Sequence, residues 1–583
     1  MFTHSIYVSI IKLINKLAGE TMNTIHTEIS KEGSIIYVYN QNNENSIRLN
    51  SKISPRREIQ KFLKDFKKDK VYFIIGIGNS EIIRQLLELK LDNNVVLVEP
   101  FDDIKINEDL MDDIRSSKLR ILTFDEFTPL KVNEVIRHGM GLKYEIIFHP
   151  NYEKIDPAIL KNTMDIIKKG ATITQINKNT ERAFREEWIT EPVLNLGYFE
   201  KSIDIKEYTE KFNNKDAIIV ASGPSLKENI DFIKANKDSA YIFATGSAIN
   251  GLIHQGISPD FVTIIDASKI NYDAHFKNSA YTGVIISAGT TNHEILKFHN
   301  GPLFMTNFMG DTISFESRPD LITIPSAPSV AIYTLLMTHF MGFQNVYLVG
   351  QDLALSDGKY YAEGVKEHKG SLNLGQIIEV KANSGEQTKT THALSSMLES
   401  FNNVMSMLNK TEKTPNVFNL SLHGAKILHV PYKNKSEIFI ENSIDKSWLG
   451  DLTKPSLSYS KSNEYKCLIE NNKNELENYI KKLERFNKKA INLVDLISLL
   501  KLVKKMRQNE FIEKHILPKV YSDTQKINNM FEFGFEGNFA TNEERLEMLE
   551  TLDSFIRYVY KYVNEVSVSN RWKHLSEENN DDQ

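Results

Sequence analysis

The chain has 583 residues, 41% of them hydrophobic and 25% charged, so it is long enough to build several globular cores. Its formal net charge of −5 gives no overall positive field, which excludes wholesale binding to a nucleic-acid backbone. The single cysteine, Cys467, excludes an internal disulfide and a cysteine-cluster zinc site. No run approaches roughly 18 uninterrupted apolar residues, so we expect a cytoplasmic protein with no membrane span.

The first 54 residues are expected to form a leader followed by a short hairpin. Residues 6–17 are fairly apolar but are interrupted by lysine and asparagine, which favours a weak amphipathic helix over a signal peptide. Met22 is an alternative start of the protein. Loose alternation of apolar and polar residues over 33–49 predicts a β-hairpin.

Residues 55–175 are expected to form a Rossmann-like α/β domain, because short apolar runs alternate there with amphipathic stretches. A glycine turn, Gly76-Ile77-Gly78, follows the first apolar run, and Glu99 ends the next one at a spacing that suits an acid binding ribose hydroxyls. The third glycine of the dinucleotide motif is missing, so a plain strand–helix turn is the alternative. The predicted strands cover residues 71–76, 95–100, 121–124 and 144–150.

The same alternation starts again in a larger α/β domain, expected over residues 176–445, with a helix at 330–340. Residues 446–583 are expected to form a helical C-terminal domain with a disordered tail, because residues 462–569 have long helical periodicity and no clear strands. Residues 475–506 predict one long helix or a pair. The fold class is therefore two Rossmann-like α/β domains followed by an α-helical C-terminal domain. The strands expected in the second α/β domain, together with the turns that follow them, lie at 217–226, 241–249, 261–266, 283–289, 303–307 and 345–353.

A second glycine turn, Gly223-Pro224-Ser225, stands between an apolar strand and a helix start. Glycine permits close approach of the backbone, and proline removes a donor where a helix start has donors to spare. The N–H groups at the helix start then suit a phosphate. Ligands gather at the carboxyl ends of strands in such sheets, which strengthens an otherwise weak motif.

Further polar residues are predicted at the same edge of this sheet. Asp266 and Asp352 each end a strand, and helix capping or turn formation is the alternative role for both. Surface packing is the alternative for the two tyrosines that follow Asp352. The other residues of this set are Ser326, Ser329, Tyr360 and Tyr361.

These residues resemble the motility-associated factor (Maf) or DUF115 family of flagellin glycosyltransferases. The resemblance covers roughly residues 190–435. The central domain of the Maf family is in turn similar to the bacterial sialyltransferases of glycosyltransferase family 42. It implies transfer of a pseudaminic- or legionaminic-type nonulosonic acid from a CMP-sugar to serine or threonine of flagellin. It is carried by AIIVASGPSLKENIDFI (217–233), SPDFVTIID (258–266), PSVA (328–331), VGQDLA (349–354) and NLSLHGAKILHV (419–430), with HPNY (149–152) similar to the end of the family's N-terminal domain.

By this similarity, the turn at Gly223 would hold the CMP moiety, and Tyr360 or Tyr361 would bond the leaving phosphate. The sialyltransferases have asparagines where this chain has Ser222 and Gly246, so its contacts to cytidine differ in detail. The donor-binding residues that the resemblance implies are Ser222, Gly223, Pro224, Ser225, Thr245, Gly246, Asp266, Ser326, Ser329 and Gln351.

Displacement of CMP by a hydroxyl also needs a base, and histidine suits that role near neutral pH. The sialyltransferase base follows the Asp352-type turn and precedes a helix, which favours His392 here and leaves His368 second. His423 and His429 are further candidates after the turn, and Asp352 itself is the non-histidine alternative.

No cofactor or metal site is indicated by the spacing of acids, histidines and cysteine, although Mg²⁺ assistance is left open. Two other functions remain. The same broad family includes archaeal relatives of 6-hydroxymethylpterin diphosphokinase, for which Asp266 and Asp352 could hold magnesium. A flagellar chaperone or scaffold without activity is the third. The oligomeric state is not indicated.

Overall fold

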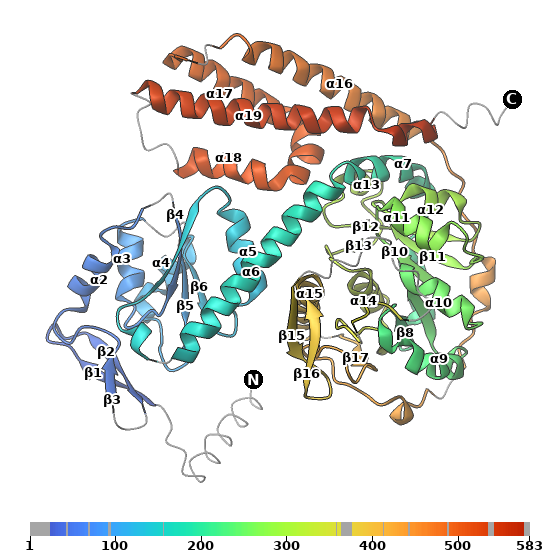
Figure 1. The fold of residues 1–583 in the computed structure, drawn as a ribbon, viewed down its shortest axis with the longest axis horizontal. Helices are drawn as coiled ribbons and strands as arrows, with labels where there is room; N and C mark the ends of the chain where they lie inside the picture. Colours follow the sequence, from blue (N-terminus) through green and yellow to red (C-terminus); the bar gives the residue numbers. More distant parts are fainter. Residues whose placement is uncertain are drawn as a thin grey trace. The chain divides into compact units, whose positions relative to one another are not determined.

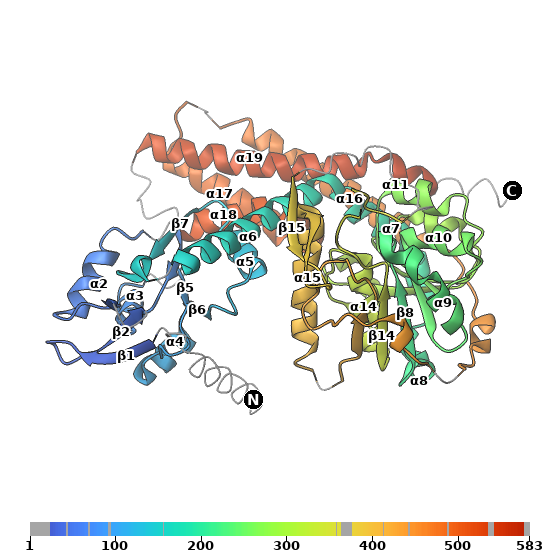
Figure 2. The ribbon, with the colours of Figure 1, turned by 60° about the horizontal axis from the view of Figure 1, so that its bottom comes forward.

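The computed structural model describes residues 24–41, 45–67, 70–90, 95–155, 157–356, 358–362, 376–411, 413–440, 443–486, 489–533 and 541–575. The predicted leader helix at 6–17 lies outside them. Contacts divide the chain into two compact units (Figures 1 and 2). The N-terminal unit comprises the chain up to residue 175 with residues 522–538, and the central unit comprises the rest. None of the described helices is long and apolar enough to cross a membrane.

The N-terminal unit begins with a small antiparallel sheet of β1 (Thr24–Ile29), β2 (Ile35–Gln41) and β3 (Asn45–Arg48). Strands β2 and β3 are the predicted hairpin, and β1 pairs with the other edge of β2. Buried Tyr39 and Leu49 join the core of the unit, so the hairpin is part of its hydrophobic packing.

The main sheet of the N-terminal unit is parallel, in the order β6-β5-β4-β7. Successive residues of β4 face opposite sides: Ile74 packs with helices α2 and α3, whereas Phe73 packs with α5 and α6. The elements are β4 (Lys70–Ile75), β5 (Val95–Glu99), β6 (Arg120–Thr123), β7 (Lys143–Phe148), α2 (Pro55–Leu63), α3 (Glu81–Glu88), α4 (Met111–Ser116), α5 (Pro129–His138) and α6 (Pro157–Phe184).

Helix α18 (Tyr521–Phe533) also belongs to the N-terminal unit, although in sequence it lies between the two segments of the central unit. Its Gln525 side chain donates a hydrogen bond to the carbonyl of His138 at 3.1 Å, and Asn529 donates to the carbonyl of Met140 at the same distance. These bonds satisfy carbonyls at the end of α5 and in the loop that follows it.

The central unit contains an eight-stranded parallel sheet in the order β13-β12-β11-β10-β9-β8-β14-β17. Its strands are continuous apolar runs because helices cover both faces. The strands are β8 (Asp216–Val220), β9 (Tyr241–Thr245), β10 (Phe261–Ile264), β11 (Val284–Ala288), β12 (Leu303–Phe308), β13 (Thr323–Ile324), β14 (Asn345–Val349) and β17 (Asn416–Asn419).

Two helical layers enclose this sheet. Ile219 of β8 faces α14 (Val330–Phe340) and α15 (His392–Leu408), whereas Ile218 faces the helices of the other layer. Figure 1 shows α14 and α15 on one side of the sheet and α10 and α12 on the other. The second layer contains α7 (Glu187–Lys201), α9 (Ile230–Asn236), α10 (Ile249–His254) and α12 (His293–Phe298).

The predicted C-terminal helices are present as α16 (Ser460–Leu483), α17 (Leu493–Gln508) and α19 (Asn542–Ser567), in addition to α18. The stretch predicted as one long helix or a pair is a pair, since α16 ends ten residues before α17 begins. One hairpin was not predicted: β15 (Ile377–Lys381) and β16 (Gln387–Thr391) pair antiparallel just before α15.

Candidate functional site

The site lies where the strand order of the central sheet changes direction. Strand β8 is first in the sequence; β9 to β13 extend the sheet on one side of it, and β14 and β17 on the other. The connections after β8 and β14 therefore leave in opposite directions, which opens a crevice at their carboxyl ends. The turn after β8, which contains Gly223, meets the turn after β14, which contains Asp352. The N–H of Gly223 donates a hydrogen bond to the carbonyl of Gly350 at 2.9 Å.

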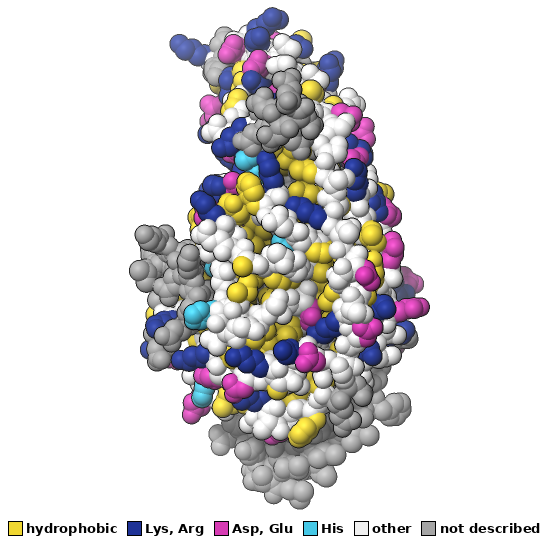
Figure 3. All heavy atoms as spheres, turned by 90° about the vertical axis from the view of Figure 1, so that its right-hand side faces the viewer, with side chains coloured by type: hydrophobic (Ala, Val, Ile, Leu, Met, Phe, Trp, Pro, Cys, Tyr) yellow, Lys and Arg dark blue, Asp and Glu magenta, His cyan; other side chains and the backbone are white. Residues whose placement is uncertain are grey.

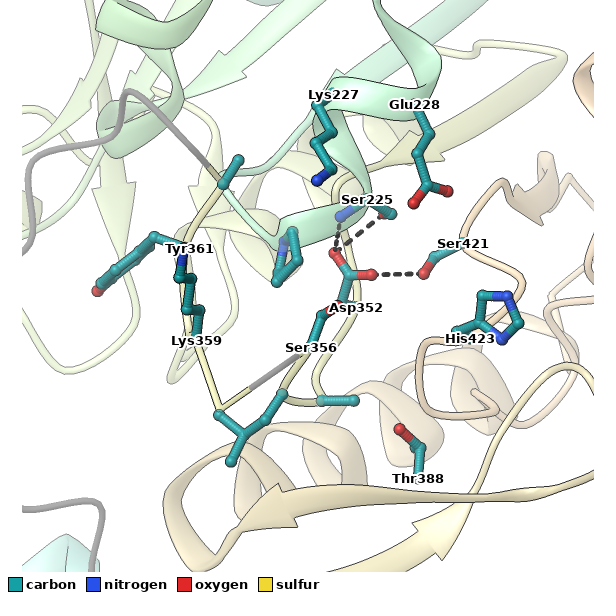
Figure 4. Close-up of a pocket in the computed structure, with 14 residues that line it drawn as sticks. Ser225, Lys227, Glu228, Asp352, Ser356, Lys359, Tyr361, Thr388, Ser421 and His423 are labelled. Carbon is teal, nitrogen blue, oxygen red and sulfur yellow. Dashed lines mark hydrogen bonds between the residues drawn. The ribbon is translucent and has the colours of Figure 1, made fainter.

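Asp352 joins three turns at this crevice. Its Oδ2 accepts hydrogen bonds from the N–H and the hydroxyl of Ser225, at 3.1 and 3.0 Å, and its Oδ1 accepts one from the hydroxyl of Ser421 at 2.5 Å (Figure 4). Burial raises the pKa of the Asp352 carboxyl, and the bonds from Ser421 and Ser225 act in the opposite direction. Asp352 therefore holds the turns after β8, β14 and β17 together.

This arrangement changes what the Ser225 turn can offer a ligand. The sequence predicts a free helix start there, but Pro224–Asn229 is a 3₁₀ helix and the N–H of Ser225 is already bonded to Asp352. An anion in the pocket would therefore meet side-chain donors rather than this N–H.

A pocket of about 280 Å³ opens beside the Asp352 cluster, near the lower end of the range for small-molecule sites, roughly 300–1,000 Å³. Five of the candidate residues line it: Pro224, Ser225, Asp352, Tyr361 and His423. Figure 4 shows the Tyr361 ring directed away from Asp352. The remaining lining residues are Lys227, Glu228, Ala354, Leu355, Ser356, Lys359, Ala362, Thr388 and Ser421.

The other predicted donor-binding residues lie outside this lining, at neighbouring strand ends. The hydroxyls of Ser222 and Ser247 are 2.8 Å apart and link the turns after β8 and β9. Asp266 accepts a hydrogen bond from the N–H of Ser268 at 2.7 Å, which is a turn-forming bond, and Ser329 caps α14. Thr245 ends β9 and Gly246 follows it, Ser326 is exposed, and the carbonyl of Gln351 accepts a hydrogen bond from the Asn419 side chain. The roles proposed for these four residues stay predictions.

Tyr360 and His392 also lie outside the pocket lining. The Tyr360 hydroxyl donates to the Thr391 hydroxyl at 2.8 Å, and Thr391 caps α15. His392 is the first residue of α15, and its Nε2 is 3.3 Å from Oε1 of Gln376. Of the other histidines weighed, His423 lines the pocket, His429 is exposed in the loop after β17, and His368 lies outside the described residues.

Sequence reasoning did not assign a role to six polar residues of the pocket. Two of them, Lys227 and Glu228, stand inside the SGPSLKE stretch, and Ser421 stands inside NLSLHGA, so both motifs contained a usable signal. Ser356, Lys359 and Thr388 had none, because no motif marks the loop after β14 or the hairpin strand β16.

The glycine turn of the N-terminal unit is filled by the protein itself. The N–H of Ile77 donates to Oε2 of Glu99 at 2.8 Å, and the Tyr152 hydroxyl donates to the same oxygen at 2.9 Å. A Cβ on Gly76 would lie 2.4 Å from the Tyr152 ring. Tyr152 and Glu99 thus occupy the space in front of the turn where a nucleotide-binding domain receives its ligand.

Two buried groups beside this turn have opposed pKa shifts. Burial raises the pKa of Glu99 from 4.5 to about 7, against the lowering effect of its hydrogen-bond donors. Burial lowers the pKa of His149 from 6.5 to about 4. The raised pKa of Glu99 stabilises the folded state at low pH, and this stabilisation is lost as the pH rises to 7. The lowered pKa of His149 stabilises the folded state at high pH, and this stabilisation is lost as the pH falls to 4. The two effects therefore nearly cancel.

Substitution should reveal each effect separately. With His149→Gln, the free energy of unfolding of the N-terminal unit, relative to wild type, should fall by about 1.4 kcal/mol per pH unit as the pH rises from about 4 to 6.5, the folded and unfolded pKa values of His149. With Glu99→Gln it should rise by a similar amount. Hydrogen exchange of the β4 and β5 amides in the full chain, corrected for intrinsic rates, measures this. Two variants with parallel pH dependences would contradict the assignment.

Comparison with known proteins agrees with this architecture. A family model described as 6-hydroxymethylpterin diphosphokinase MptE-like, often called DUF115, matches residues 193–358. An uncharacterized protein of Treponema pallidum (strain Nichols) is 29% identical over 140 residues, which are 23% of this chain; the match spans 60% of that relative's length. The Maf glycosyltransferase from Magnetospirillum magneticum AMB-1 matches with a TM-score of 0.51 and 13% identity over 95% of both chains. The chain therefore has the fold of a Maf glycosyltransferase, as its sequence predicts.

Proposed function

We propose that the chain is a protein O-glycosyltransferase that moves a pseudaminic- or legionaminic-type nonulosonic acid from a CMP-activated donor to serine or threonine of flagellin, with inversion, in the cytoplasm. The observation that carries the proposal is the pocket at the β8–β14 crevice, in a fold shared with a glycosyltransferase. Such crevices bind nucleotides in parallel α/β sheets, and the Ser225 and Asp352 turns that the resemblance implicates both line this one.

The pocket can stabilise the charge that develops on a leaving CMP. As the bond from the sugar to the phosphate breaks, the phosphate gains negative charge, which nearby cations and hydroxyls stabilise. Lys227 and Lys359 line the pocket, and neither forms an ion pair with a described side chain. On the face of the molecule drawn in Figure 3, Lys and Arg side chains are interspersed with Asp and Glu.

A pterin diphosphokinase is the second candidate, because the matching family model is described by that activity. Its magnesium would need Asp266 and Asp352 near one another. These residues follow β10 and β14, which are separated by β9 and β8, so their backbones lie about 14 Å apart at the usual strand spacing. Both oxygens of Asp352 are also already bonded. The arrangement therefore favours glycosyl transfer.

One assay separates the candidates. The full chain is incubated with unmodified flagellin and CMP-pseudaminic or CMP-legionaminic acid, and the intact mass of flagellin is measured. A gain of one or more sugar residues, absent with Asp352→Ala, supports the proposal. No gain, together with ATP-dependent diphosphorylation of hydroxymethylpterin, identifies the kinase. Tight flagellin binding with neither reaction identifies the chaperone.

A further inference from the structure

We propose that His423 is the catalytic base that takes the proton from the acceptor hydroxyl; the assignment rests on the proposed function. The titratable residues lining the pocket are Lys227, Glu228, Asp352, Lys359, Tyr361 and His423. Lysine and tyrosine side chains hold their protons at neutral pH, and Asp352 is committed to three hydrogen bonds. Glu228 and His423 are left, and imidazole is the better proton acceptor near neutrality.

The backbone that carries His423 is fixed from two sides. On one side, the Ser421 hydroxyl and the N–H of Ala425 both bond to Asp352, the latter to its carbonyl at 2.7 Å. On the other side, the turn between β15 and β16 bonds to the same segment. The N–H of Asn383 donates to the carbonyl of Gly424 at 3.0 Å, and the N–H of Ser384 donates to the carbonyl of Leu422 at 2.9 Å. The side-chain amide of Asn383 donates to the backbone carbonyl of Ser421 at 2.8 Å.

The imidazole itself is available. His423 is exposed, and no described residue hydrogen-bonds to its ring. Figure 4 shows it beside Ser421, at the edge of the pocket. His392 differs on both counts, because its Nε2 contacts Gln376 and it does not line the pocket. A fixed backbone with a free side chain is the arrangement that a base needs to meet a second substrate at the pocket edge.

The acceptor oxygen forms a bond to the anomeric carbon of the donor sugar, and the bond from that carbon to the phosphate oxygen breaks. CMP leaves with the bonding electron pair, and the acceptor proton passes to a ring nitrogen of His423. The imidazolium then returns its proton to water, so no oxidant, reductant or further reactant is consumed.

The test uses His423→Ala and His423→Gln in the full chain. We expect kcat for transfer to flagellin to fall roughly 10²–10⁴-fold, with CMP affinity unchanged within about threefold. The acidic limb of the kcat–pH profile should also disappear. His254→Ala is the control, because His254 is exposed on α10 of the same unit and lies outside the pocket lining.

The same assays run on Glu228→Gln, His392→Ala and His368→Ala. The assignment is overturned if His423→Ala keeps kcat within about threefold, if one of the other variants removes the acidic limb instead, or if CMP affinity falls in parallel with kcat. If the wild-type chain transfers no sugar, the proposed function fails and this assignment with it. If the wild-type chain transfers the sugar and His423→Ala does so equally well, the assignment of His423 is wrong and the proposed function still stands.

Discussion

Replacing Asp352 by alanine is expected to weaken CMP binding at least about 30-fold and to abolish measurable transfer to flagellin. The change leaves three donors without their acceptor: the N–H and hydroxyl of Ser225 and the hydroxyl of Ser421. Each unsatisfied buried donor costs about 1–3 kcal/mol, so the three turns would rearrange to reach water. Titration calorimetry with CMP and the flagellin mass assay measure the two losses.

Replacing Asp352 by asparagine separates positioning from catalysis. One oxygen of asparagine can still accept from Ser225, and the Ser421 hydroxyl can rotate to accept from the amide nitrogen. If Asp352 only positions the turns, this variant should keep CMP affinity and kcat within about threefold. Retained CMP affinity with lost turnover would instead support the catalytic role that the sequence suggests. Normal CMP binding by Asp352→Ala would contradict the positioning role.

The sequence predicts the sheet well because a parallel strand covered on both faces is a short apolar run, and each run here ends in a turn residue. Strands β8, β9, β10, β11, β12 and β14 all fall within the predicted runs or within a residue of them, whereas the short edge strands β13 and β17 were not predicted. The hairpin β15–β16 carries no such signal. The residues of β15 alternate between exposed and half-buried. Strand β16 reads Gln-Thr-Lys-Thr-Thr, and its buried residues are the two threonines at its end, so no apolar period marks it.

The individual residues of the candidate site could be found from their strand ends, but their partners could not. Asp352 is a visible strand-end carboxylate, yet Ser225 is 127 residues away and Ser421 is 69 residues away. Which strand ends meet depends on the strand order. After β13 at one edge of the sheet, the chain crosses back to pair β14 with β8, and no local sequence pattern encodes that crossing. The same limit applies to α18, which packs in the N-terminal unit although the chain of the central unit continues on both sides of it.

Replacing Gly223 by alanine should be nearly as damaging as losing Asp352, although it adds only one methyl group. The new Cβ would lie 2.3 Å from Oδ2 of Asp352 and 2.4 Å from the carbonyl oxygen of Gly350. Neither oxygen atom can move aside easily. Oδ2 of Asp352 is held by its hydrogen bonds from Ser225, and the Gly350 carbonyl is part of the backbone. Gly350 has a φ of +68°, and its own Cβ position is 2.2 Å from the carbonyl oxygen of Ala221, so this backbone is already held on its far side.

The two turns must therefore separate in Gly223→Ala, which breaks the bond between the Gly223 N–H and the Gly350 carbonyl. Overpacking of this kind costs about 1–3 kcal/mol, and we expect CMP affinity to fall at least about tenfold. Gly450→Ala is the steric control, because its Cβ would meet nothing within 4 Å.

Gly246→Ala tests whether the nucleotide lies close to the turn after β9, because this substitution should affect ligand binding without disturbing the free protein. Its Cβ would meet the Phe276 ring at 3.4 Å, an ordinary contact, so the free protein should tolerate it with an unchanged melting temperature. A loss of CMP affinity in that variant would then report a ligand close to the turn after β9, as the resemblance to the sialyltransferases implies. Normal CMP affinity in Gly223→Ala would contradict the placement of the nucleotide at the β8–β14 crevice, whatever Gly246→Ala does.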